Sequence, residues 1–98
     1  MANHFMILND YDFAKAINAI ENNNKTKFER IMKKFIRECG GLSGVNYNWS
    51  LFEDFNEIKE VFQDELETGD FYVVDLITFE VFKITSTIVV SSPQIINF

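Results

Sequence analysis

The sequence has few of the residues from which covalent frameworks, metal sites and phosphate sites are built. It contains one cysteine, which excludes an intramolecular disulfide framework and a cysteine-based zinc cluster, and one histidine, which excludes a histidine-rich metal site. Its glycines are not followed by the lysine and helix start of a phosphate-binding loop. No apolar run approaches the roughly 18 residues that a membrane span needs, and no signal-peptide pattern opens the chain. We therefore expect a soluble protein of the cytoplasm (the host cytoplasm, if the protein is viral), with no metal or cofactor and no contact with membranes.

Apolar residues are abundant enough to build one core. The 98 residues are 47% hydrophobic and include 11 phenylalanines, so we do not expect the chain to be disordered. A second domain would leave neither half enough core. We expect a single compact domain over residues 1–98.

Hydrophobic spacing and capping patterns predict three helices in the first two thirds of the chain. The second and third helices begin with capping boxes at Thr26–Glu29 and Ser50–Glu53, in which the hydroxyl accepts a backbone hydrogen bond and the glutamate reaches back. Residues 41–48, with two glycines and two asparagines, are expected to form a loop. The predicted helices run from Asn9 or Asp10 to about Glu21, from Thr26 to the Gly40–Gly41 pair, and from Ser50 to Thr68.

From Asp70 onwards the hydrophobic period changes to two, and β-branched and aromatic residues predict an antiparallel sheet. A tight hairpin is expected at Asp75–Glu80, although Phe79 stands where a glycine is usual. The segment Asn3–Leu8 is expected to form a short strand or an extended arm, and the apolar tail Ile95–Phe98 to dock on its own domain or on a partner. The predicted C-terminal strands are Phe71–Leu76, Phe79–Thr85 and Thr87–Ser91.

These elements predict an α+β fold, with the helices packed on the inner face of the C-terminal sheet. The helical stripes and alternate strand positions should supply most of the buried anchors. The predicted anchors are Phe28, Ile31, Phe35, Phe55, Phe62, Val73, Val81 and Phe82.

No arrangement of residues indicates catalysis. His4 has the one side chain with an ordinary pKa near neutrality, but no serine or cysteine nucleophile is tied to it by a known spacing. Cys39 occupies the last apolar position of the second helix, where a free cysteine behaves as a small hydrophobe. We expect that the protein is not an enzyme.

The charge is distributed unevenly along the chain. Residues 53–75 contain nine carboxylates against Lys59, a local charge of −8, whereas residues 25–38 carry a local charge of +4. Five of the carboxylates recur every three or four residues, which on a helix places them in one row about 21 Å long, at about 1.5 Å of rise per residue. Like charges at this spacing destabilise a helix, so alternating charges would serve folding better. The row is either a partner-binding surface or a solvated polar face that is acidic for solubility. The candidate partner-binding residues are Glu53, Glu57, Glu60, Asp64 and Glu67.

The basic segment suggests the opposite activity, direct binding of nucleic acid. Its row of Lys27, Arg30, Lys34 and Arg37 is short, has no interleaved aromatic residue and belongs to a chain of net charge −6. We therefore expect no direct nucleic-acid binding. We expect these cations to pair with the acidic helix, within the molecule or across a closed two-fold homodimer, or to be solvated.

Small size, acidity and the carboxylate row together predict an interaction protein. In general character, and without a shared motif, the chain resembles the small acidic inhibitors with which phages and archaeal viruses block CRISPR effectors or restriction enzymes, in some cases as DNA mimics. The partner would then be a protein with a basic, nucleic-acid-binding surface. An immunity protein that neutralises a bacterial nuclease toxin and a non-catalytic subunit of a larger complex are the alternatives.

Overall fold

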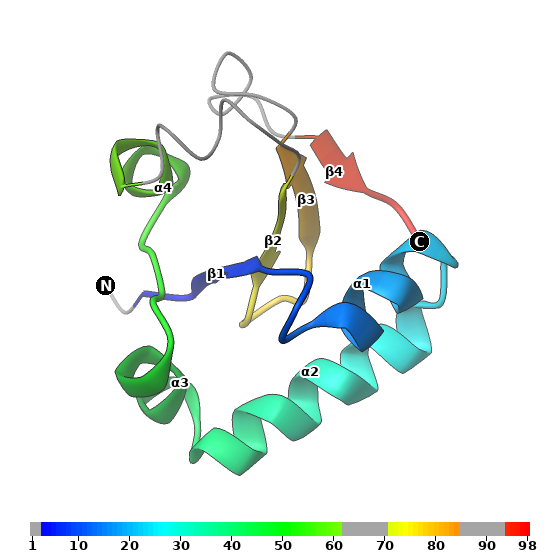
Figure 1. Cartoon of the computed structure of the whole chain (residues 1–98), viewed down its shortest axis with the longest axis horizontal. Coiled ribbons are helices and arrows are strands. Elements are labelled where there is room, and N and C mark those ends of the chain that lie inside the picture. Colours follow the sequence, from blue (N-terminus) through cyan, green and yellow to red (C-terminus); the bar gives the residue numbers. More distant parts are fainter. Residues whose placement is uncertain (1–2, 62–70, 85–93) are drawn as a thin grey trace.

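Four antiparallel strands form the centre of the structure, and helices lie on both faces of the sheet (Figure 1). The computed structural model describes residues 3–61, 71–84 and 94–98. The strands are ordered β1-β2-β3-β4, so the predicted α+β class is confirmed, including the short N-terminal strand. The elements are β1 (Phe5–Leu8), α1 (Ala14–Glu21), α2 (Lys25–Cys39), α3 (Leu42–Asn48), α4 (Phe55–Val61), β2 (Phe71–Asp75), β3 (Val81–Ile84) and β4 (Gln94–Ile96).

Alternate residues of the strands pack into two separate apolar clusters, one on each face of the sheet. Met6 and Val74 join the larger cluster, which includes buried residues of α1, α2 and α3. Val73 and Ile84 join the smaller cluster, which is covered by Ile58 of α4. The expectation that all helices cover one face is therefore wrong. The near-continuous apolar run in residues 71–76 is what a strand buried on both faces requires.

Helix α2 forms where its hydrophobic stripe predicts. Phe28 and Met32 are fully buried, and Gly40 ends the helix in the left-handed conformation at φ 87°. The predicted start at Thr26 is wrong, because the side chain of Asn24 accepts the cap hydrogen bond from the Lys27 amide at 3.1 Å. Asparagine is at least as good an N-cap as threonine, and its earlier position adds two residues to the helix.

Helix α3 occupies the segment that was expected to be a loop. Its one fully buried residue, Val45, packs into the larger cluster. Gly44 lies so close to the end of α2 that a Cβ at this position would overlap the carbonyl oxygen of Cys39. The glycine that suggested a loop is therefore used for close approach of two helices.

The predicted hairpin at Asp75–Glu80 is confirmed. The Asp75 amide donates to the Glu80 carbonyl at 2.9 Å, and the Asp75 carboxylate accepts the Ile77 amide at 2.8 Å. Phe79 adopts φ 63°, the conformation in which glycine is usual. Its ring packs against the larger cluster, and Lys33 Nζ lies 5.7 Å from the ring centre. The partial burial of this ring against the cluster counteracts the backbone strain.

The C-terminal tail docks on its own chain. Strand β4 pairs with β3, and the Phe98 ring meets the buried Phe28 ring edge-on at 5.5 Å. The predicted strand Thr87–Ser91 and the predicted anchor Phe62 lie outside the described residues. Among the other predicted anchors, Phe28, Val73 and Val81 are fully buried. Ile31, Phe35, Phe55 and Phe82 are half-buried and pack against the two clusters.

Of the helices in the described ranges, none combines the length and apolar character needed to cross a membrane.

Replacing Gly44 by alanine tests the close contact between α2 and α3. Helix propensity alone would make this change stabilising by about 1 kcal/mol. Because the added methyl overlaps the Cys39 carbonyl, we expect destabilisation of about 1–3 kcal/mol instead. Urea unfolding gives the sign, with the exposed Ser43→Ala in the same helix as the control. An increase in stability would contradict the close contact.

Candidate functional site

Helix α4 is held against the sheet by aromatic and aliphatic side chains. Ile58 is fully buried, and the Phe55 ring lies 5.0 Å from the Phe5 ring and 5.1 Å from the Phe82 ring. These contacts fix one side of the helix on β1 and β3. The exposed residues Asn56 and Glu60 therefore lie on the side that faces solvent.

The segment before α4 is extended, not helical. Leu51 and Phe52 are each 4% exposed, and Phe52 forms an antiparallel bridge with Phe5 through backbone hydrogen bonds of 3.0 and 2.8 Å. Helical backbone at Ser50–Glu53 would break this bridge. The predicted helix start is therefore wrong, and Glu53 precedes the helix.

The cap of α4 lies four residues after the predicted one. The Glu57 amide donates to the Asp54 carboxylate at 2.9 Å, and the Glu57 carboxylate accepts the Glu53 amide at 3.4 Å. These two hydrogen bonds resemble the reciprocal pair of hydrogen bonds between side chain and backbone in a capping box. Two of the carboxylates in the acidic segment therefore stabilise the helix start.

The structure describes three of the five residues in the predicted carboxylate row. Glu53 lies outside the helix, Glu57 and Glu60 lie in α4, and Asp64 and Glu67 are outside the described residues. Glu53, Asp54 and Glu60 are exposed, and Glu57 is half-buried. We call Glu53, Asp54, Glu57 and Glu60 the α4 acidic surface.

The basic residues of α2 lie on the opposite face of the sheet from α4 (Figure 1). The side chains of Lys27, Arg30, Lys34 and Arg37 are exposed. Among the described residues, no ion pair joins an α2 cation to an α4 carboxylate. Intramolecular pairing with the described part of the acidic segment is therefore not what balances these cations.

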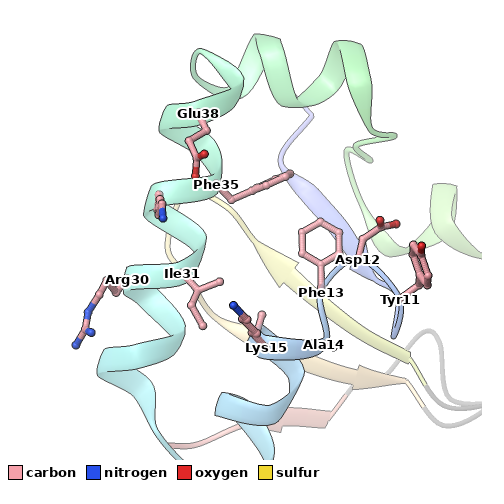
Figure 2. Close-up of a pocket in the computed structure, with 11 residues that line it drawn as sticks. Tyr11, Asp12, Phe13, Ala14, Lys15, Arg30, Ile31, Phe35 and Glu38 are labelled. Atoms are coloured by element: carbon pink, nitrogen blue, oxygen red, sulfur yellow. The ribbon is translucent and has the colours of Figure 1, made fainter.

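A groove between α1 and α2 was not predicted from the sequence. It has a volume of about 640 Å³ and opens beside the exposed cations of both helices (Figure 2). Recognising it requires the packing of α1 on α2, for which the sequence gives no local signal. The groove is lined by residues 11–16 and by Arg30, Ile31, Lys34, Phe35 and Glu38, and we call it the α1–α2 groove.

His4 and Cys39 each lie next to a structural part of the fold. His4 Nε2 lies 3.7 Å from a carboxylate oxygen of Asp75, the residue that organises the hairpin. Cys39 is half-buried and packs against the larger cluster at the end of α2. In the ranges that the structure describes, no three histidine, cysteine or acidic side chains gather as metal ligands would.

Comparison with protein-family models, with curated proteins and with solved structures finds no match for this chain. The function is therefore inferred from the α4 acidic surface and from the exposed cations of α2.

Substitution of the α4 carboxylates one at a time distinguishes those that cap the helix from those that do not. Asp54→Ala removes the cap acceptor of the Glu57 amide and should destabilise the protein by about 1 kcal/mol. Glu60→Ala removes an exposed carboxylate and should change stability by less than about 0.5 kcal/mol. Thermal unfolding of both variants checks this difference, and equal stabilities would contradict the capping role.

Proposed function

We propose that this chain is a non-enzymatic binding protein whose α4 acidic surface engages a basic, nucleic-acid-binding surface of another protein. The observation that supports this most is the separation of charge across the sheet. The α4 carboxylates and the α2 cations lie on opposite faces and do not pair among the described residues. The acidic surface is therefore not neutralised by α2.

Two of the carboxylates have no structural task within the described part of the chain. The Glu53 and Glu60 side chains are exposed and make neither a hydrogen bond nor an ion pair there. A basic partner would supply the missing counter-charge without breaking any internal contact. Such contacts mainly accelerate association and weaken as salt rises.

Proteins that handle nucleic acid present basic clefts shaped for a row of phosphates. An inhibitor of the anti-CRISPR or anti-restriction kind, acting for a phage or virus as a DNA mimic, would use the α4 acidic surface in this way. In this proposal, Asp64 and Glu67 extend the surface along the sequence.

An immunity protein against a nuclease toxin is the second candidate, because its target carries the same kind of basic cleft. The observations that support the inhibitor support this candidate equally. The third possibility, a subunit that docks through its apolar tail, is weakened because β4 and Phe98 pack on their own chain.

The placement of the charges also bears on self-association. Contact between the α2 face of one copy and the α4 face of another would be heterologous, since these faces point in opposite directions (Figure 1). Such contacts form rings or open chains. A closed two-fold homodimer that pairs these two faces is therefore disfavoured.

Removing the charges of Glu53 and Glu60 tests the proposed function. The tagged protein is used to capture its partner from the source cells, the partner is identified by mass spectrometry, and its Kd is measured by calorimetry. Glu53→Gln with Glu60→Gln should raise Kd at least tenfold, about 1.4 kcal/mol, with unfolding unchanged.

The matched control is Asp10→Asn with Glu21→Gln, which removes the same charge from exposed positions away from α4. This control should leave Kd within twofold of the wild type. If both double variants bind as tightly as the wild type, the α4 acidic surface is only a solvated face.

A further inference from the structure

We infer that the α1–α2 groove binds an acidic, amphipathic peptide segment of a partner protein. The groove lies on the face of the sheet opposite α4 and carries the opposite charge. The inference is therefore independent of the function proposed for the α4 acidic surface.

The floor of the groove is apolar and firmly supported. The Phe13 and Phe35 rings meet edge-on at 5.1 Å, and both contact the Trp49 ring, at 5.2 and 5.8 Å. Phe13 is buried, whereas Ile31 and Phe35 keep part of their surface open. In Figure 2, Phe13 projects from the loop before α1 towards α2, and Ile31 projects from α2 beside Lys15. The volume of about 640 Å³ lies within the roughly 300–1,000 Å³ typical of ligand sites.

The groove lining carries three cations against two carboxylates, Asp12 and Glu38, and so has a small positive excess. The cations Lys15, Arg30 and Lys34 form the rim of the groove, and all three side chains are exposed. Within the described ranges none of them forms an ion pair. The Lys15 amine extends towards α2 across the opening, and Arg30 stands at the outer edge of α2 (Figure 2). An occupant with carboxylates near its apolar side chains would satisfy both the rim and the floor.

An aromatic residue stands at the edge of this site. The Tyr11 side chain is 94% exposed and belongs to the groove lining. Tyrosine is among the residues that most often contribute large binding energies at protein interfaces, because its ring is large and its hydroxyl tolerates water. Its position favours contact with a bound peptide.

The lining favours a peptide over a nucleic acid. Two carboxylates, Asp12 and Glu38, belong to the groove together with the cations. They would repel a strand that carries a phosphate on every nucleotide, in a chain whose net charge is already −6. A peptide can space its carboxylates to meet the cations and place apolar side chains on Ile31 and Phe35.

A displayed library of random 16-residue peptides, selected on the full 98-residue chain, provides the test. Selected peptides should be enriched in Asp and Glu and should carry at least one large apolar residue. With a labelled selected peptide in fluorescence anisotropy, Lys34→Glu and Tyr11→Ala should each raise Kd at least fivefold. Lys27→Glu makes the same charge change at an exposed position of α2 outside the groove, and it should change Kd less than twofold.

Four outcomes would overturn the inference. The selected peptides could lack acidic residues, or they could bind Lys34→Glu as tightly as the wild type. A 16-nucleotide oligo(dT) could bind the groove more tightly than the best peptide. Light scattering could show that the groove is occupied by a second copy, through self-association that Lys34→Glu abolishes. Because Tyr11, Lys27 and Lys34 are exposed, circular dichroism should show unchanged folding in all three variants. The Glu53→Gln and Glu60→Gln pair should leave peptide affinity unchanged, which separates this inference from the proposed function.

Discussion

The backbone bridge between Phe5 and Phe52 holds the chain at the point where it crosses from one face of the sheet to the other. The bridge lies beside β1, an edge strand of the sheet, so two hydrogen bonds occupy backbone groups that an edge strand would otherwise expose. Leu51 joins the cluster under α1, α2 and α3, whereas the next residue, Phe52, joins the cluster under α4. Extended backbone sends successive side chains to opposite faces, and this alternation places α4 on the face that the other helices leave open.

The charge separation follows from that crossing. With helices on both faces, the sheet and its two apolar clusters stand between the cations of α2 and the carboxylates of α4. Two packed layers separate the surfaces by a distance on the order of 20 Å. This exceeds the Debye length of about 8 Å at physiological ionic strength, so the surfaces interact with each other only weakly. A small chain thus presents surfaces of opposite charge on its two faces.

Local sequence patterns correctly predicted the elements for which only one such pattern is present. The stripe from Phe28 to Cys39 identified α2 and its glycine end, and the Asp75–Glu80 hairpin formed despite Phe79. The start of α4 was not predictable in this way, since Ser50–Glu53 and Asp54–Glu57 both match a capping pattern. Pairing with Phe5, far away in the sequence, decides between them. Gly44 contributed to the wrong prediction of a loop for a related reason, because a glycine is suited both to a loop and to a close contact between helices.

The candidate sites, too, could be predicted only in part from local sequence patterns. Sequence spacing identified the acidic residues, but it could not show that Glu57 is engaged at the helix start, or that Glu53 and Glu60 make no side-chain contact of this kind within the described residues. The α1–α2 groove depends on how Phe13, just before α1, meets Phe35 of α2, a long-range contact that no local pattern encodes. Because most apolar side chains of α2 and α4 are used on the two sheet faces, the outward surfaces of these two helices are left mainly to charged and polar residues. A partner with a basic cleft would meet the α4 acidic surface first through long-range attraction, and this orientation would turn the α1–α2 groove away from the cleft. The groove would then stay open to a second, acidic segment, so the two proposed contacts are compatible in one complex.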